Sequence, residues 1–315
     1  MKNKHRIILQ SVIFICTIIA GIRFHFFLEN IYTGNNDAVK PYAVEGFLPI
    51  GALAALKQFI VTGIYDKIHP AALTFFLFAI IISIIFKRSF CGYICPVGFV
   101  SEIVSRFSRN IKINKYIDML LSSIKYIILF FFLYFILYKM DILSIKYFLN
   151  SSYYIVSDAK MYYLFAYPSL TTIITLLVLI ILTFFIKNFW CRFLCPYGAL
   201  LGLISLLSPF KIKRNKSACT KCKKCTEVCP QSINIHLQNK IITPECIGCM
   251  KCIDYKSKKD CLNITHISYR PAIITVIIGI LFILMIISAN IFGIWKSEIT
   301  TEEYRAHLFN IQGYK

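Results

Sequence analysis

The sequence predicts an all-α polytopic membrane protein with about five transmembrane helices, a duplicated helical hairpin and a small inserted α+β segment. Three observations predict this fold. Hydrophobic residues make up 57% of the 315 residues, and the mean hydropathy is +0.66, so the chain has more apolar material than a soluble domain needs to bury. Several apolar runs approach membrane-spanning length. One cysteine motif occurs twice, and eight further cysteines gather in the last third of the chain.

Five apolar runs are long enough, or nearly so, to cross a hydrocarbon core about 30 Å thick as helices. They are residues 7–27, 71–86, 118–138, 169–186 and 271–294. The second run becomes long enough only if the helix continues through Phe90. The third carries Lys125 near one end, where a lysine side chain can snorkel to the headgroups. The first has no small-x-small cleavage site after Phe27 and is longer than a signal core, so we expect an uncleaved anchor.

The runs and motifs divide the chain into five expected parts. They are residues 1–138, with a first hairpin repeat and the start of a second; 139–210, with an outer interfacial segment rich in tyrosine, a membrane helix and the second cysteine motif; 217–263, a cytoplasmic cysteine-rich segment; 271–294, a last membrane helix; and 295–315, an extracytoplasmic tail.

Lysine and arginine residues predict the orientation, because these residues are retained on the cytoplasmic side of a membrane. With the N-terminus inside, 25 of the 35 lie in inner segments. We therefore expect the N-terminus and the cysteine-rich segment in the cytoplasm, and the C-terminus outside. The same bias accounts for the net charge of +20, and no nucleic-acid motif accompanies it, so nucleic acid is not an expected partner. All but one of the 13 cysteines fall on this reducing side.

The cysteine-rich segment has the spacing of ligands for two cubane iron–sulfur clusters. It reads Cys219-x2-Cys222-x2-Cys225-x3-Cys229-Pro230, then Cys246-x2-Cys249-x2-Cys252 and a later Cys261. Three cysteines two residues apart can reach three corners of one cube, and the fourth cysteine of such a run ligates the other cluster. The expected sets are Cys219, Cys222, Cys225 and Cys261 for cluster 1, and Cys246, Cys249, Cys252 and Cys229 for cluster 2. Zinc is the alternative, but two runs of three cysteines at this spacing disfavour it.

Residues 217–263 resemble the bacterial two-cluster ferredoxin fold, which implies two [4Fe-4S] clusters. The second half departs from the family pattern. Eight residues, 253–260, separate Cys252 from Cys261 where the first half has three, and Leu262 stands where that pattern has proline. A lengthened surface loop is usually tolerated. Cys261 is therefore the ligand that the pattern supports least.

A second motif is duplicated at an offset of 100 residues. Cys91-x3-Cys95-Pro96-x-Gly98 matches Cys191-x3-Cys195-Pro196-x-Gly198, and each copy follows an apolar run. We expect two parallel helical hairpins with their motifs side by side at the inner membrane face. The four cysteines could serve a redox role or hold a further cluster or metal, because cysteines four apart share a helical face. Alternatively, small cysteines allow close packing while proline and glycine shape a bend.

The two motif types together resemble the NapH family of periplasmic nitrate reductase systems, the membrane portion of NosR and the CcoG-type membrane ferredoxins. The resemblance covers residues 70–265. It implies an electron-transfer subunit of the cytoplasmic membrane, between a quinol or cytoplasmic donor and a partner oxidoreductase. Two alternatives stay open: a redox-sensing or metalloenzyme-assembly factor, and a CcoG-like copper reductase. No nucleotide-binding or catalytic-triad motif appears, so an electron-transfer subunit is favoured over an enzyme with its own substrate.

Histidines offer few further redox sites. The sequence has no C-x-x-C-H, which excludes covalent c-type haem. His25 and His69 lie near the same expected interface and are candidate contacts for a quinone, although isolated interfacial histidines are more often solvated.

Overall fold

A computed structural model of the chain describes residues 4–34, 39–107, 111, 113–255, 261–265 and 271–312. The fold is mostly helical and divides into two compact units. Unit 1 contains Met1–Phe14, Ala79–Leu129 and Thr175–Leu281. Unit 2 contains Ile15–Phe78, Phe130–Ile174 and Phe282–Lys315.

Three helices among the described residues are long and apolar enough to cross a membrane. They are α1 (Lys4–Thr33), the helix Tyr116–Lys139 formed by α5 (Lys115–Leu133) and a π-helical turn (Tyr134–Lys139), and α13 (Pro271–Ile291). The helices α8 (Ser157–Ala166) and α9 (Leu170–Phe185) would together make a fourth span, bent by 74°. The chain is therefore a polytopic membrane protein, and the total of five spans stays a prediction.

Helix α3 (Pro70–Phe86) is shorter than the second expected span needs. It does not continue through Phe90, because Lys87 has a φ of 63° and this left-handed backbone ends the helix. Phe90 instead begins a separate π-helical turn, Phe90–Ile94. The extension to Phe90 is therefore wrong, and α3 has 17 residues.

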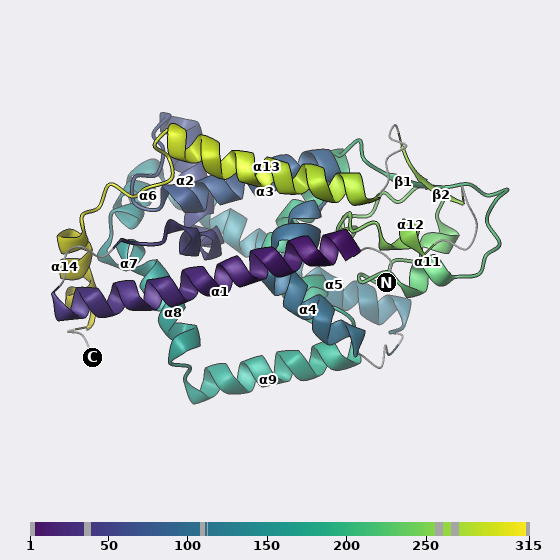
Figure 1. Cartoon of the computed structure of the whole chain (residues 1–315), viewed down its shortest axis with the longest axis horizontal. Helices are drawn as coiled ribbons and strands as arrows, with labels where there is room; N and C mark the ends of the chain where they lie inside the picture. Colours follow the sequence, from purple (N-terminus) through teal and green to yellow (C-terminus); the bar gives the residue numbers. More distant parts are fainter. Residues whose placement is uncertain are drawn as a thin grey trace. The chain divides into compact units, whose positions relative to one another are not determined.

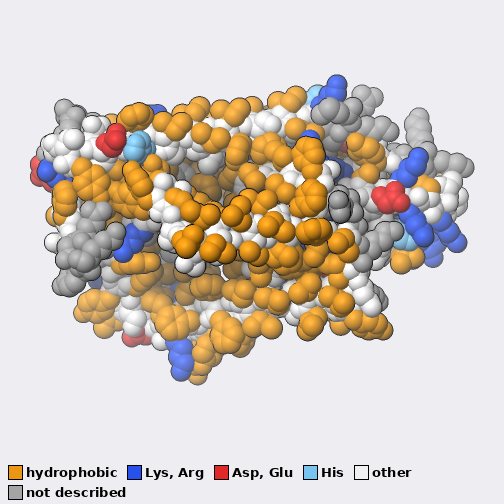
Figure 2. Space-filling view, turned by 90° about the horizontal axis from the view of Figure 1, so that it is seen from below, with side chains coloured by type: hydrophobic (Ala, Val, Ile, Leu, Met, Phe, Trp, Pro, Cys, Tyr) orange, Lys and Arg blue, Asp and Glu red, His pale blue; other side chains and the backbone are white. Residues whose placement is uncertain are grey.

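Exposed apolar side chains cover much of the surface. Large aliphatic and aromatic residues are exposed along α1, α9 and α13, and hydrophobic side chains cover most of the face in Figure 2. Contiguous apolar surface of this extent is unfavourable in water. It is favourable against lipid chains, which agrees with a membrane protein.

The cysteine-rich segment in unit 1 has a small α+β fold. Strand β1 (Ile212–Arg214) pairs antiparallel with β2 (Leu262–Ile264), with Ile212 opposite Ile264. Helix α11 (Lys224–Glu227) contacts α12 (Lys251–Asp254), and α12 contacts β2 (Figure 1). Each short helix follows a residue with left-handed backbone, Lys223 or Met250. The two halves therefore repeat one local structure, as expected for a two-cluster ferredoxin fold.

Unit 2 is held together by its own helices and a buried polar centre. Its helices are α2 (Pro49–Thr62), α6 (Ile142–Leu149), α7 (Ser152–Ile155), α8 and α14 (Thr301–Gln312), with the 3-10 helix Tyr42–Phe47. The Lys40 ammonium lies 2.9 Å from a Glu45 oxygen and 2.6 Å from an Asp158 oxygen. The Tyr304 hydroxyl donates a hydrogen bond of 2.7 Å to Asp158. The expected polar tail is thus folded against this unit through α14, which contacts α7.

We predict that Lys40→Met destabilises the protein strongly. The substitution leaves the fully buried Glu45 and Asp158 side chains without their cation, and breaking a buried pair in this way costs about 3–5 kcal/mol. Chemical denaturation in a single detergent measures the change. The matched control is Lys67→Met, whose ion pair with Glu298 is exposed and should contribute no more than about 1 kcal/mol. Equal losses for the two variants would contradict the role of the buried centre.

Candidate metal centres

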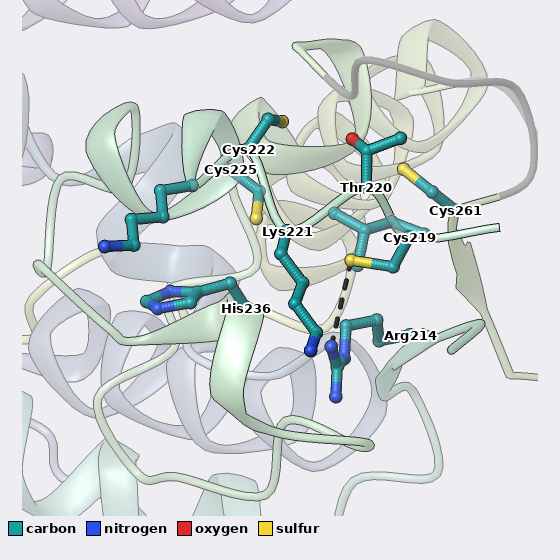
Figure 3. Close-up of a pocket in the computed structure, with 10 residues that line it drawn as sticks. Arg214, Cys219, Thr220, Lys221, Cys222, Cys225, His236 and Cys261 are labelled. Atoms are coloured by element: carbon teal, nitrogen blue, oxygen red, sulfur yellow. Dashed lines mark hydrogen bonds between the residues drawn. The ribbon is translucent and has the colours of Figure 1, made fainter. Parts of the chain in front are cut away.

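The four cysteines expected to hold cluster 1 line one pocket. Cys219 and Cys222 come from the loop before α11, Cys225 lies in α11, and Cys261 directly precedes β2 (Figure 3). Lys221 and Lys223 have φ values of 54° and 63°, so the loop turns sharply between successive cysteines. The backbone N–H of Lys221 bonds the Cys219 sulfur and lowers the pKa of that thiol, with a further contribution from the Arg214 guanidinium at 3.8 Å. These donors favour the thiolate form, which is the form that binds metal.

The four cysteines expected to hold cluster 2 line a second pocket and are all buried. Its other lining side chains are mostly isoleucines, with Met250. Burial raises the pKa of the Cys229 thiol to about 12, so a free thiolate is unfavourable here and a metal–thiolate bond would stabilise it. Four sulfurs in an apolar pocket suit a [4Fe-4S] cluster. Of the lengthened loop 253–260, residues 256–260 lie outside the described residues.

Both copies of the duplicated motif fold alike in unit 1. Each begins with a π-helical turn, Phe90–Ile94 or Trp190–Leu194, in which the second cysteine's N–H bonds the carbonyl five residues back at 3.0 Å. A helix follows each turn, α4 (Pro96–Arg106) or α10 (Pro196–Ile204). Proline is favourable at the first helical position, because an N–H there would have no partner within the helix.

The structure brings the two cysteine pairs of these motifs together. Cys91, Cys95 and Cys195 lie near enough to Cys191 to interact with it electrostatically. Burial, and then the charges of these three sulfurs, raise the pKa of the Cys191 thiol. Gly198 has Arg88 and Cys195 as its neighbours: a Cβ there would lie 2.8 Å from an Arg88 nitrogen and 3.5 Å from the Cys195 sulfur. Four sulfurs and one guanidinium therefore converge between the two motifs.

A buried ion pair joins this centre to the cysteine-rich segment. One Glu245 oxygen lies 3.4 Å from an Arg88 nitrogen and 2.6 Å from the Lys125 ammonium. Burial alone would raise the pKa of the Glu245 carboxyl, but the charges of Arg88 and Lys125 hold it below its usual value. The expectation that Lys125 extends to the headgroups is therefore wrong, because its ammonium is buried against a carboxylate of the same protein.

The charges around the four sulfurs do not balance among these side chains. Arg88 and Lys125 are almost fully buried cations, and Glu245 supplies one negative charge to the two of them. An uncompensated buried charge is unfavourable. A metal bound by four thiolates carries net negative charge, so such a group fits this site electrostatically.

The loop that carries the second set of cysteines sits directly on the first π-helical turn. Gly92 lies so close that a Cβ there would be 2.5 Å from the Ile247 carbonyl oxygen. The Tyr93 hydroxyl donates to the Gly248 carbonyl at 3.3 Å. Gly248, with a φ of 62°, lies against Ser89 and the Phe86 carbonyl. Close backbone approach thus connects the second pocket to the turn that contains Cys91.

A second ion pair fastens the same region. The Arg6 guanidinium bonds the Gly92 carbonyl at 2.8 Å and also pairs with Glu102. The Lys251 ammonium, from the residue before Cys252, lies 2.5 Å from the same Glu102 oxygen. The N-terminal helix, α4 and α12 are therefore linked by charge in unit 1.

The sequence motifs assigned no role to Arg88 or Glu245, although one signal was available. The duplicated motifs differ at the third position before the first cysteine, where Arg88 corresponds to Asn188. Arg88 faces Glu245, whereas the side-chain amide oxygen of Asn188 accepts hydrogen bonds of 3.1 and 3.0 Å from Ser101 and Ser105. Among the positions at which the two copies differ, this one distinguishes the copy that pairs with Glu245.

The two candidate quinone histidines have different partners among the described residues. His69 is fully buried, with Nδ1 3.1 Å from Glu45 and Nε2 2.8 Å from the Tyr154 carbonyl. His25 is partly exposed, 3.3 Å from Glu29. His69 thus belongs to the polar centre of unit 2.

Comparison with known proteins identifies matching families over both cysteine regions. A family described as "4Fe-4S binding domain" matches residues 68–114 and again 169–215, one match for each copy of the duplicated motif. A "4Fe-4S dicluster domain" matches residues 211–255. The chain therefore carries domains that bind [4Fe-4S] clusters.

Several curated proteins are similar in sequence. The "Putative electron transport protein YccM" of Escherichia coli is 35% identical over 313 residues, covering 94% of this chain and 87% of that protein. The "Ferredoxin-type protein NapH" of Haemophilus influenzae is 27% identical over 60% of this chain and 68% of its own length. The "Regulatory protein NosR" of Pseudomonas aeruginosa is 25% identical over 55% of this chain and 24% of its own length. No solved structure matches the chain.

We predict that Gly92→Ala loosens the contact between the π-helical turn and the loop of the second pocket. The added methyl group would overlap the Ile247 carbonyl, and overpacking of this kind costs about 1–3 kcal/mol. Denaturation followed through the loss of bound iron measures it. The control is Gly21→Ala in α1, where a Cβ meets nothing within 4 Å and the helix should gain about 0.5–1 kcal/mol. Unchanged iron retention in Gly92→Ala would contradict the tight contact.

Proposed function

The chain belongs to the family of the putative electron transport protein YccM, and we propose that it transfers electrons between a redox partner outside the bilayer and the membrane. Members of this family are ferredoxin-type electron-transfer proteins. The general activity is iron–sulfur electron transfer. A bound [4Fe-4S] cluster accepts and releases single electrons. The remaining work of the protein is to hold the clusters, exclude water and balance their charge.

We assign the eight ferredoxin cysteines to two ligand sets. Cys219, Cys222, Cys225 and Cys261 would hold cluster 1, and Cys229, Cys246, Cys249 and Cys252 would hold cluster 2. Each set lines a single pocket, which supports this assignment over one in which each run keeps its own fourth cysteine. The isoleucine-rich wall of the second pocket would exclude water from that site.

The duplicated motif would form a third redox centre from Cys91, Cys95, Cys191 and Cys195. The observation that carries this proposal is the contact of the 244–250 loop with the first motif, in which Gly92 meets Ile247 and Arg88 meets Glu245. Arg88 and Lys125 would balance the negative charge of four thiolates around a metal. The protein would thus connect the second pocket to the membrane helices through rigid, buried contacts.

The orientation of the protein and its redox partners are assigned from the sequence. The strong excess of lysine and arginine in the inner segments supports a cytoplasmic N-terminus and cysteine-rich segment, an outer C-terminus and residence in the cytoplasmic membrane. With α3 and α9 as spans, the helices would number five. The redox partners would be a cytoplasmic donor or the quinone pool on one side, and an oxidoreductase on the other.

We predict a specific pattern of iron loss that identifies the two ligand sets. Wild-type protein should hold about eight iron atoms in the two ferredoxin clusters, or about twelve if the third centre is also a cubane. Cys229→Ala with Cys246→Ala should remove about four, because both residues serve cluster 2. Cys229→Ala with Cys219→Ala should remove about eight, because the pair serves two clusters.

Iron and acid-labile sulfide assays with EPR of the dithionite-reduced protein measure this pattern. Cys16→Ala is the control, since Cys16 lies in α1 outside all three sets. The reverse pattern, with the greater loss in Cys229→Ala/Cys246→Ala, would show that Cys229 serves cluster 1. Zinc in place of iron would overturn the proposed function.

We predict that Cys91→Ser with Cys191→Ser slows electron transfer into the bilayer at least tenfold while leaving both ferredoxin clusters in place. The substitutions remove one sulfur from each motif of the third centre. The measurement is the rate at which a short-chain quinone in proteoliposomes reoxidises the dithionite-reduced protein, followed by absorbance. Cys16→Ser provides the baseline. A double variant as fast as wild type would eliminate the motif cysteines from the pathway.

A further inference from the structure

The two ferredoxin cysteine sets differ sharply in their access to solvent. All four cysteines of the second set are buried, and the loop that carries three of them lies against the first π-helical turn. In the first set, Cys222 is exposed, and Cys219 and Cys225 are partly exposed. A soluble protein can therefore approach the first set more closely than the second.

The surface around the first set is strongly basic. Residues 211–240 contain eight lysine or arginine residues and a single acidic residue, Glu227. Arg214, Lys221 and Lys223 line the first pocket, and the exposed Lys224 follows in sequence. Figure 3 shows Lys221, Arg214 and His236 among the side chains that line this pocket. We call Lys221, Lys223 and Lys224 the basic rim.

The rim differs in exposure from the cations near the second set. Lys87 is buried and interacts electrostatically with Cys246, although the residues that line the second pocket are themselves uncharged. The rim lysines are exposed, where water screens their charge and their contribution to stability is small. Exposed charge of one sign acts chiefly on the encounter with other molecules.

We propose that the basic rim is the docking site of a small soluble electron-carrier protein with an acidic surface around its own redox group. This proposal deepens the proposed function and rests on it. Opposite charges would steer the carrier to the pocket and orient it. The exposed Cys222 side would then face the carrier's redox group at short range. One electron would pass between the carrier and the protein in each encounter.

A soluble partner fits this surface better than anionic lipid does. Two of the three rim lysines line a pocket whose cysteines reach the surface at Cys222, and electron exchange needs that surface to be free for a redox group. Lipid headgroups would cover this surface without offering an electron. Binding to anionic lipid is therefore a competing outcome that the experiment must detect.

The experiment measures binding of an acidic flavodoxin to the full chain in phosphatidylcholine nanodiscs, over a range of salt concentrations. We expect binding that weakens steeply with salt, and a Kd at least tenfold higher for Lys221→Glu/Lys223→Glu. The matched control is Lys146→Glu/Lys296→Glu, which makes the same change of charge at two exposed lysines of unit 2 and should leave the Kd within about twofold. Because Lys221 and Lys223 line the pocket between cluster ligands, Lys224→Glu, at a rim residue that does not line the pocket, is measured as a second variant and should also raise the Kd.

Several results would overturn the proposal. They are no flavodoxin binding by wild type, equal weakening in the control pair, or a rim that binds phosphatidylserine vesicles and not flavodoxin. Iron content and EPR are recorded for every sample. Loss of iron–sulfur signals from wild type would instead defeat the proposed function, so the two failures are distinguishable.

Discussion

The carboxylate of Glu245 is the constraint on which the organisation of unit 1 depends. It accepts from Lys125 in a membrane-spanning helix, from Tyr126 beside it and from Arg88 next to the duplicated motif. Glu245 directly precedes Cys246, so its position also sets that of the second pocket. Because the group is largely buried, loss of either partner would leave a charge without compensation. A single carboxylate therefore aligns a lipid-embedded helix, a motif centre and a ferredoxin loop.

The duplicated motif shows how a repeat can acquire two roles without changing its fold. Both copies keep the π-helical turn, the cysteines and the proline that begins the next helix. Only one copy carries an arginine that faces the cysteine-rich segment, while the other carries Asn188, which bonds two serines of α4. The shared parts bring four sulfurs together, and the difference gives one copy a buried ion pair with Glu245.

Unit 2 depends on a different use of buried charge. The Lys40 ammonium pairs with two carboxylates, and the hydroxyl of Tyr304 in α14 donates a hydrogen bond to one of them, Asp158. His69 joins this network through Glu45, which explains why a histidine near an expected membrane interface is fully buried rather than solvated. The residues of this network come from widely separated parts of the sequence, so their ion pairs and hydrogen bonds hold distant segments of the unit together.

The sequence by itself determined the features that depend on local spacing. Cysteines two residues apart can meet one cube only from a tight loop, so spacing predicted two cubane clusters, and apolar runs predicted a membrane protein. Tertiary structure decided the rest. Lys125 bonds Glu245, which lies 120 residues away in the sequence, and Arg88 bonds the same carboxylate, 157 residues away. No local sequence pattern predicts these pairs. Three further features depend on such contacts: the end of α3 at Phe86, the burial of His69 and the folding of the C-terminal tail. A charged or polar side chain becomes buried and paired only after distant segments have packed around it.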